Sequence, residues 1–184
     1  MMNLSYDKVL NEIQTTLSKS NFGDLIVFIE KILTCEQIVV YGAGRVGLVM
    51  KSFSMRLNHL GLKSFFLGDS NVPKVDNKDL LIIGSGSGRT PSVKTIVDIA
   101  ETNGLDIICI TADKNSAIAN RSVSVLFIDT QAKDTDLKLR SSIQPMTTLF
   151  EQTLLITLDS IILMLMSKLN ETHETMTLRH NILE

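Results

Sequence analysis

The stretch LLIIGSGSGRTPSV, residues 80–93, contains the pattern on which the chain is built. Four apolar residues are followed by a loop of glycine and serine, and Thr90 and Pro91 then begin a run with helical spacing. A continuous apolar block of this kind is typical of a strand buried on both faces of a parallel sheet. Threonine is a favourable N-cap and proline a favourable first helical residue. The stretch therefore predicts a buried strand, a loop and a helix in succession.

The same succession recurs on both sides of this stretch. The other apolar blocks that predict strands are IVVYGAG at residues 38–44, KSFFLG at 63–68, LDIICITA at 105–112 and SVLFID at 124–129. Helical spacing predicts helices near residues 4–17, 25–32, 45–60, 90–103, 116–120 and 147–169. Strands that alternate with helices imply a parallel sheet with right-handed crossovers and helices on both faces.

We therefore expect an α/β protein, a three-layer α/β/α sandwich with a flavodoxin-like parallel sheet of about five strands. The 184 residues suit a single domain, 1–184, with N-terminal helices before the sheet and a helix and tail after it. Residues 129–142 are polar and without periodicity, so we expect a mobile loop before the last long helix. Ligands bind such sheets beyond the carboxyl ends of the strands.

Composition argues against nucleic acid as a partner and against a disulfide or a metal site built on cysteine. The chain has 44% hydrophobic and 21% charged residues, which suits a packed core, and its formal net charge of -2 argues against nucleic acid. Cys35 and Cys109 are far apart and lack a CxxC spacing, so we expect buried reduced thiols rather than a disulfide or a metal site.

The sequence also bears on location. Charged and polar residues interrupt the apolar positions near the N-terminus, which is unlike a secretory signal. The most apolar run, residues 154–166, contains Asp159 and Ser160 and is shorter than the roughly 20 residues that cross a bilayer. We therefore expect a buried helix, no membrane partner and a cytoplasmic protein.

The first glycine-rich loop, GAGRVG at residues 42–47, fits the GxGxxG pattern of dinucleotide binding. Asp69, near the end of the second predicted strand, is a residue type that holds a ribose hydroxyl in such sites. Taken alone this pattern is weak, because glycines at these positions also serve a tight turn without any ligand.

The second glycine-rich loop, residues 84–90, is more specific. It combines glycine amides with the hydroxyls of Ser85, Ser87 and Thr90 at the start of a helix. Unpaired amides and the helix dipole favour an anion there, and hydroxyls add hydrogen-bond donors. An alternative is that Thr90 is only an N-cap. Capping needs one hydroxyl and the loop offers three, so a phosphate site is favoured.

Five segments resemble those of the 6-phospho-3-hexuloisomerases, a family of SIS-domain phosphosugar isomerases. GSGSGRTPSV is similar to the SGSGET-type phosphate segment of SIS domains, and GAGRVG and KSFSMRLNHLG are similar to the family's GAGRSG and KAFAMRLMHLG. IQPMTTLFEQ is similar to QPMGSLFEQ, and the final RHNILE to HANLE. Two positions differ from the family: Val46 replaces a serine, and Arg89 replaces a glutamate. Arg89 would either strengthen anion binding or pair elsewhere.

The resemblance implies an isomerase that interconverts 3-hexulose 6-phosphate and fructose 6-phosphate through a cis-enediol, in the ribulose monophosphate pathway. This reaction needs a base and proton shuttles but no cofactor. Glu151 matches the family's catalytic glutamate. From its position alone, Glu151 could equally be an exposed first-turn carboxylate that complements the helix dipole.

His59 and His180 are the other catalytic residues that the resemblance implies. His59 would open the sugar ring or transfer protons, although a histidine just before the helix-ending Gly61 also suits a structural role. His180 would reach a site only if the C-terminal segment folds back or crosses into a neighbouring subunit. The residues expected to bind the phosphosugar are Gly44, Arg45, Ser85, Gly86, Ser87, Thr90 and Gln144.

The individual binding residues have alternatives too. Arg45 would clamp phosphate or hydroxyl oxygens, or it is a solvated arginine at a helix start. The resemblance implies that Gln144 and Pro145 shape the sugar end of the site. The resemblance further implies a homo-oligomer, a dimer or a tetramer, for which the apolar last helix offers a surface.

Three other functions stay open at this point. One is the isomerisation of another phosphosugar, such as arabinose 5-phosphate. Another is a non-catalytic phosphosugar-binding protein, which would need the second glycine-rich loop, residues 84–90 (the hydroxyl loop), but neither Glu151 nor His59. A dinucleotide oxidoreductase would leave the GSGSGRT loop unexplained.

Overall fold

The sheet confirms the predicted architecture. The computed structural model describes residues 5–130 and 142–183, so most of the loop predicted over 129–142 lies outside the described residues. The strands are β1 (Ile38–Gly42), β2 (Ser64–Phe66), β3 (Leu80–Gly84), β4 (Asp106–Thr111) and β5 (Ser124–Phe127). They pair in parallel in the order β2-β1-β3-β4-β5, which is the flavodoxin-like order.

The helices follow the predicted alternation closely. They are α1 (Tyr6–Lys19), α2 (Leu25–Thr34), α3 (Gly44–His59), α4 (Pro91–Thr102), α5 (Thr148–Leu169) and α6 (His173–Thr177). The short helix expected at 116–120 is a 3-10 turn, η1 (Ala119–Arg121). The sequence analysis missed α6, whose first turn is held by a capping box between Thr172 and Thr175.

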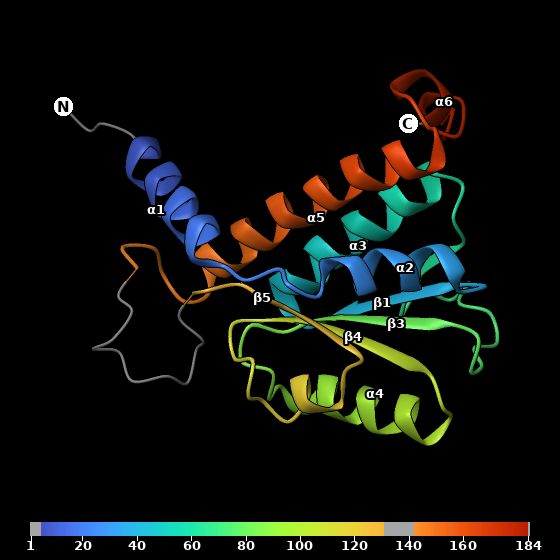
Figure 1. The fold of residues 1–184 in the computed structure, drawn as a ribbon, viewed down its shortest axis with the longest axis horizontal. Coiled ribbons are helices and arrows are strands. Elements are labelled where there is room, and N and C mark those ends of the chain that lie inside the picture. The colour runs from blue at the N-terminus through green and yellow to red at the C-terminus, as the bar shows by residue number, and fades with distance from the viewer. Residues whose placement is uncertain (1–4, 131–141, 184) are drawn as a thin grey trace.

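Each face of the sheet carries its own part of the core, because successive strand residues point to opposite faces. Strand residues such as Val40, Ile82 and Ile110 pack with α2, α3 and α5 on one face. Val39, Ile83 and Cys109 pack with α4 on the other face (Figure 1). Burial raises the pKa of the Cys109 thiol to about 12, which fits the expected inert, reduced cysteine.

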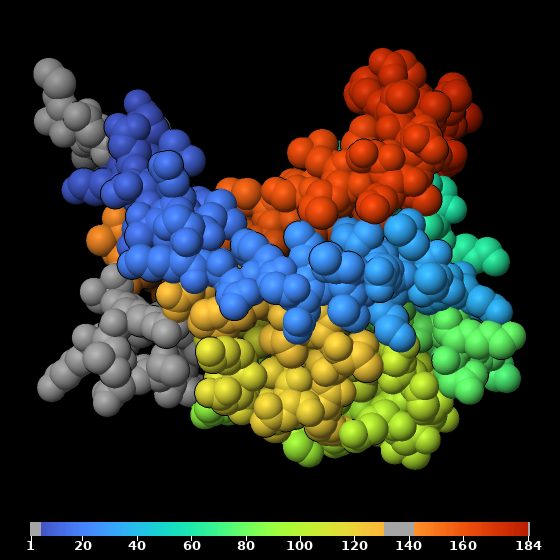
Figure 2. Space-filling model, in the orientation of Figure 1, coloured from blue at the N-terminus to red at the C-terminus, as the bar shows by residue number. Residues whose placement is uncertain are grey.

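Helix α5 is longer than the apolar run, residues 154–166, by which its role was predicted. Its 22 residues are enough, by length and composition alone, to cross a bilayer. The expectation that this segment is too short to do so was therefore wrong. Half of its most apolar window is nevertheless buried inside the fold, where α5 packs on α3. Figure 2 shows α1 and the C-terminal segment rising on either side of α5. The burial supports the predicted role as a core helix.

The first glycine loop brings α3 into direct contact with the sheet. A Cβ on Gly47 would lie 2.4 Å from the carbonyl oxygen of Gly42, and a Cβ on Gly84 would lie 2.8 Å from Sδ of Met50. Gly42 and Gly84 are partners in the register of β1 and β3. The GxGxxG pattern thus serves close packing at the carboxyl ends of both strands. Asp69, the predicted ribose ligand of such a site, is ion-paired with Lys51 at 2.7 Å.

Candidate active site

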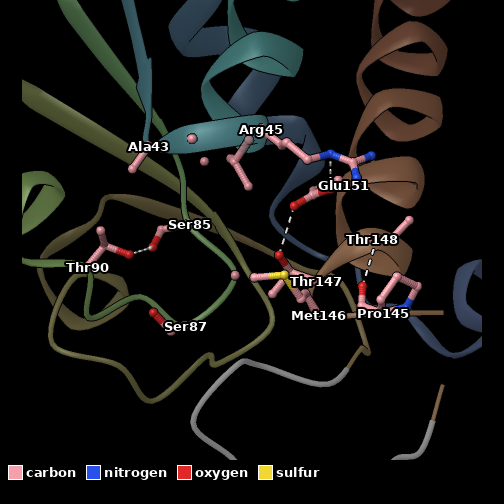
Figure 3. Close-up of a pocket in the computed structure, with 14 residues that line it drawn as sticks. Ala43, Arg45, Ser85, Ser87, Thr90, Pro145, Met146, Thr147, Thr148 and Glu151 are labelled. Carbon is pink, nitrogen blue, oxygen red and sulfur yellow. Dashed lines mark hydrogen bonds and ion pairs between the residues drawn. The ribbon is translucent and has the colours of Figure 1, made fainter.

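A cavity of about 380 Å³ lies where both glycine loops meet the start of α5 (Figure 3). It sits beyond the carboxyl ends of β1 and β3, the position at which parallel α/β sheets bind their ligands. The lining residues are Ala43, Gly44, Arg45, Val46, Gly84, Ser85, Gly86, Ser87, Thr90, Pro145, Met146, Thr147, Thr148 and Glu151. Seven of the ten predicted site residues are therefore brought together: Gly44, Arg45, Ser85, Gly86, Ser87, Thr90 and Glu151.

The hydroxyls of the second glycine loop line one side of the cavity. Thr90 is the N-cap of α4, but its side chain makes no capping hydrogen bond and lies 3.5 Å from Oγ of Ser85. Ser87 accepts a hydrogen bond from the amide of Arg89 at 3.3 Å, and its hydroxyl proton remains available to another acceptor. Thr90 is thus turned toward Ser85 rather than toward its own helix, which fits an anion-binding role better than a capping role.

The loop after β4 supports the hydroxyl loop from behind. The amide of Ala112 donates to the carbonyl of Gly86 at 3.0 Å, and Oγ1 of Thr111 donates to the same oxygen at 3.3 Å. Gly88 has φ of 59°, and a Cβ there would lie 2.0 Å from Oγ of Ser116. Only glycine fits this position, both for its left-handed backbone and for the space behind it. The sequence analysis did not identify these supporting residues.

The two departures from the family pattern have distinct outcomes. Arg89 donates to Asp113 at 2.6 Å, so it pairs elsewhere instead of lining the cavity. Val46 lines the cavity and belongs to the apolar core. Its Cγ1 atom lies close to Gly84, where a Cβ would approach it to 2.9 Å. The family's serine is thus replaced by a methyl surface at the base of the cavity.

Glu151 lies in the first turn of α5 and is buried, with 7% of its surface exposed. Its Oε1 accepts a hydrogen bond from the hydroxyl of Thr147 at 2.8 Å. Its Oε2 forms an ion pair with Nε of Arg45 at 2.9 Å, but Oε2 accepts no hydrogen bond of proper geometry from any residue that the structure describes. The alternative of an exposed dipole-complementing carboxylate is excluded by this burial.

Thr147 is a site residue that the sequence analysis missed. Its spacing of four residues from Glu151 is a signal that was present, because residues at i and i+4 lie side by side at a helix start. Met146, its neighbour, lines the cavity with φ of 56°, a left-handed backbone that is uncommon for a residue other than glycine.

Gln144 does not take the predicted place in the site. It is not among the cavity-lining residues, and its amide donates to Oε2 of Glu12 in α1 at 3.1 Å. The next residue, Pro145, does line the cavity. The chain turns between Gln144 and Pro145 and carries the glutamine side chain toward α1, so of the two residues expected at the sugar end only Pro145 lines the cavity.

His59 and His180 lie together at the other end of the molecule's long helices. Their ring centroids are 5.2 Å apart, and Arg179 donates to the carbonyl of His59 at 3.1 Å. Fourteen residues of α3 separate Arg45 from His59, which places them about 20 Å apart along the helix. The C-terminal segment thus folds back onto His59, but neither histidine lines the cavity that contains Glu151.

Within the described ranges, no three His, Cys, Asp or Glu side chains gather closely enough to hold a metal ion. The chemistry that the cavity offers consists of a buried carboxylate, a guanidinium and a loop of amides and hydroxyls. Such a set suits a small phosphorylated molecule from which a proton is removed.

Known proteins are similar to this chain in sequence and in fold. Residues 31–156 match the SIS domain. A Bacillus subtilis protein named 3-hexulose-6-phosphate isomerase is 36% identical, with 96% of each chain covered, and a Mycobacterium gastri protein of the same name is 32% identical, covering 96% of this chain and 88% of the relative.

Solved structures agree with the sequence comparison. A Methanococcus jannaschii protein, whose structure was reported to infer a molecular function of 3-hexulose-6-phosphate isomerase, has a TM-score of 0.84 at 33% identity and covers 97% of this chain and 98% of its own. A match to the SIS domain over most of the chain, and such relatives over nearly all of it, leave one conclusion. This chain belongs to the SIS domain family, among the relatives that include the 3-hexulose-6-phosphate isomerases.

Proposed function

We propose that this protein is an isomerase that interconverts 3-hexulose 6-phosphate and fructose 6-phosphate. The observation that carries the proposal is Oε2 of Glu151, a buried carboxylate oxygen at the cavity that accepts no hydrogen bond from the described residues. Among the described residues, the partner of this oxygen is the ion pair with the largely exposed Arg45, and a buried carboxylate held in this way is retained where a substrate proton completes its hydrogen bonding. The names of the relatives support the choice of substrate.

The proposed reaction uses the two sides of the cavity for different tasks. The amides and hydroxyls of residues 84–90 hold the phosphate, at the N-terminus of α4. Glu151 takes the proton from C2 of the 3-ketose while the carbonyl oxygen on C3 gains a proton, which gives a cis-enediol. Glu151 then returns its proton to C3 while the hydroxyl on C2 gives up its own proton, which leaves the carbonyl at C2. Thr147 fixes the orientation of the carboxylate, while Arg45 offsets its charge and faces the oxygens of the sugar.

In this proposal His59 and His180 act in the site of a second copy of the chain. They lie about 20 Å along α3 from their own cavity, so only another subunit brings them to a carboxylate such as Glu151. The outer side of α5 offers a contact surface between α1 and the C-terminal segment (Figure 2). The exposed apolar residues on α5 are Leu155, Ile156, Leu163 and Met164. We propose a homo-oligomer, a dimer or a tetramer, built on this surface.

The remaining features follow from the same proposal. The chain acts as a single SIS domain, since both glycine loops and the first turn of α5 contribute to one cavity. We place it in the cytoplasm as a soluble enzyme of sugar phosphate metabolism, in the ribulose monophosphate pathway. No cofactor is needed, because a base and proton shuttles suffice for an enediol mechanism.

The decisive experiment is to incubate the purified protein with 3-hexulose 6-phosphate and to follow fructose 6-phosphate. Glu151→Gln is expected to lower kcat by about 10²- to 10⁴-fold, the usual contribution of a general base. Glu30→Gln, an exposed carboxylate on α2, is the matched control and is expected to leave kcat unchanged. A wild type that produces no fructose 6-phosphate would overturn the proposal, and arabinose 5-phosphate should then be tried as substrate.

The same variant separates catalysis from mere binding. If the protein only binds phosphosugars, the wild type and Glu151→Gln should bind fructose 6-phosphate with equal affinity in isothermal titration calorimetry. Neither of them should convert it. An active wild type together with a fully active Glu151→Gln variant would keep the family assignment but remove Glu151 as the base.

Sharing of sites between copies has a direct test. Glu151→Gln and His59→Asn are each expected to be inactive, but co-expressed chains should regain roughly a quarter of wild-type activity if random dimers assemble one complete site in half of the molecules. If verified mixed oligomers recover no activity, His59 does not act in a site that is shared between subunits.

A further inference from the structure

Glu12 is a carboxylate far from the cavity in sequence, yet it holds the segment that forms one cavity wall. It lies on α1, which projects beyond the sheet and reaches the start of α5 only with its C-terminal half (Figure 1). Ile13 and Thr16 are the buried residues of α1, so Glu12 sits at the edge of the buried face and is half-buried. A charge in such a place normally has hydrogen-bond partners.

Among the residues that the structure describes, the hydrogen-bond partners of the Glu12 carboxylate all belong to one short segment, residues 142–144. Oε1 accepts from the amide of Ile143 at 2.9 Å, and Oε2 accepts from Oγ of Ser142 at 3.0 Å and from Nε2 of Gln144 at 3.1 Å. Hydrogen bonds to an ionised acceptor are about twice as strong as neutral ones. Three of them converge on a single side chain, which fixes the segment to α1.

The anchored segment leads directly into the cavity wall. Pro145, Met146 and Thr147 line the cavity, and Met146 has the unfavourable φ of 56°. Beyond it, the amide and the hydroxyl of Thr148 donate to the carbonyl of Pro145 at 3.2 and 2.8 Å. A strained residue persists only where its surroundings hold it on both sides. Here Glu12 holds the side before Met146 and Thr148 holds the side after it.

Thr147 connects this wall to the proposed base. Its hydroxyl donates to Oε1 of Glu151 at 2.8 Å, and this bond leaves Oε2 for the ion pair with Arg45 at the cavity (Figure 3). Any shift of residues 142–147 moves the Thr147 hydroxyl and turns the carboxylate with it. Displacement of a reacting group by about 1 Å is enough to lower a rate by up to 10²-fold.

We propose that Glu12 is a positioning residue, which holds residues 142–147 so that Thr147 keeps the Glu151 carboxylate aimed into the cavity. Glu12 contacts no substrate in this arrangement, because it is absent from the cavity lining and the bonds that the structure shows for its oxygens all go to the segment. The inference rests on the proposed function for its kinetic consequence, but the anchoring itself does not depend on the reaction.

The test compares Glu12→Gln with Asp7→Asn, which removes the same charge from an exposed position on the same helix. A glutamine still fills the space, but its NH2 group cannot accept the bonds that one carboxylate oxygen now accepts. For Glu12→Gln we expect kcat to fall between about tenfold and hundredfold. KM should stay near the wild-type value, because the phosphate loop is untouched. Asp7→Asn should match the wild type in both constants.

A rescue variant separates positioning from general stability. In Glu12→Gln combined with Gln144→Glu the amide and the carboxylate change places, so the bond between them is remade and kcat should recover toward the wild type. If Glu12→Gln does not fold, as judged by circular dichroism, Gln144→Met removes one of the three bonds while leaving α1 intact. That variant should lower kcat in the same direction and leave KM unchanged, whereas a substrate contact at Gln144 would raise KM.

Hydrogen exchange measured by mass spectrometry supplies a readout that needs no activity. Amides of residues 142–151 should exchange faster in Glu12→Gln than in the wild type and in Asp7→Asn, while α4 exchanges at the same rate in all three. Unchanged exchange in this segment, or an unchanged kcat, would overturn the positioning role. If the wild type fails to act on 3-hexulose 6-phosphate, the proposed function falls, and the exchange result still decides for or against the anchor.

Discussion

The guanidinium of Arg45 lies 2.9 Å from the carboxylate of Glu151, and the two side chains differ sharply in exposure. The Arg45 side chain is 66% exposed and that of Glu151 is 9% exposed. The pair joins the first turn of α3 to the first turn of α5, that is, the first glycine loop to the long helix. Solvent screens the arginine side, so the pair contributes modestly to folding and its main effect is local, at the cavity.

Replacement of Arg45 tests this local effect. Arg45→Gln should lower kcat/KM by about tenfold to hundredfold, the value of one charge-assisted hydrogen bond to the substrate. Arg45→Lys should retain more activity, since an ammonium keeps the charge but lacks the planar fork. Steady-state kinetics measures both, with Lys74→Gln, an exposed charge outside the cavity, as the control. Equal kcat/KM for all three variants would assign Arg45 to the solvated surface.

The hydroxyl loop should act on substrate binding rather than on the chemical step. In Ser87→Ala we expect KM to rise by about tenfold or more while kcat stays close to that of the wild type, because a lost phosphate contact weakens ground and transition states equally. Ser18→Ala, on the exposed side of α1, is the comparison. A fall in kcat at constant KM would mean that Ser87 takes part in proton transfer and not in phosphate binding.

The ion pair between Arg89 and Asp113 connects the hydroxyl loop to the turn after β4. Arg89→Gln should raise KM by no more than about fivefold, since a partly exposed pair is worth up to about 1 kcal/mol. The double reversal, Arg89→Asp with Asp113→Arg, should restore KM if the pair positions the loop. If the double reversal binds the substrate more weakly than Arg89→Gln does, the positive charge at position 89 itself attracts the phosphate. Kinetics of the three variants at two salt concentrations distinguishes these results.

Acid should release the C-terminal segment through Glu171. Hydrogen bonds from Arg179 and then Thr175 lower the pKa of this carboxyl from 4.5 to about 2. A depressed pKa in the folded state means that the pair stabilises the fold fully above pH 4.5 and that this contribution is lost as pH falls toward 2. Glu171→Gln should therefore be less stable than the wild type at pH 7, and the difference should shrink below pH 4.5. Urea unfolding followed by circular dichroism measures it; a difference that is constant with pH would contradict the assignment.

Local patterns predicted the fold well because the strands are buried on both faces. A block such as LLII has one simple interpretation when no polar residue interrupts it, and all five strands were found in this way. Six of the site residues that line the cavity lie where the same logic places them, since loops after parallel strands converge at one edge of the sheet. Family resemblance then selected Glu151, whose spacing alone was ambiguous.

The errors concern contacts between distant parts of the chain. Glu12 and Gln144 are 132 residues apart, and no local pattern indicates that α1 would meet the segment before α5. The separation of His59 from the cavity, by contrast, was open to calculation, since an unbroken helix from residue 45 to 60 already places its ends about 20 Å apart. A neighbouring subunit was considered for His180 but not for His59.

The paired glycines of β1 and β3 have a consequence for how such a site can diversify. Gly84 gives the cavity a floor of main-chain atoms, and a side chain at Gly84, or at its register partner Gly42 outside the cavity lining, would press on Val46 and its neighbours. That floor offers the same peptide groups whatever the neighbouring sequence becomes, so mutation there can only damage it. Selection for a different sugar is therefore confined to the opposite wall, where Met146 and Thr147 project side chains, and a directed-evolution library for new substrates belongs there.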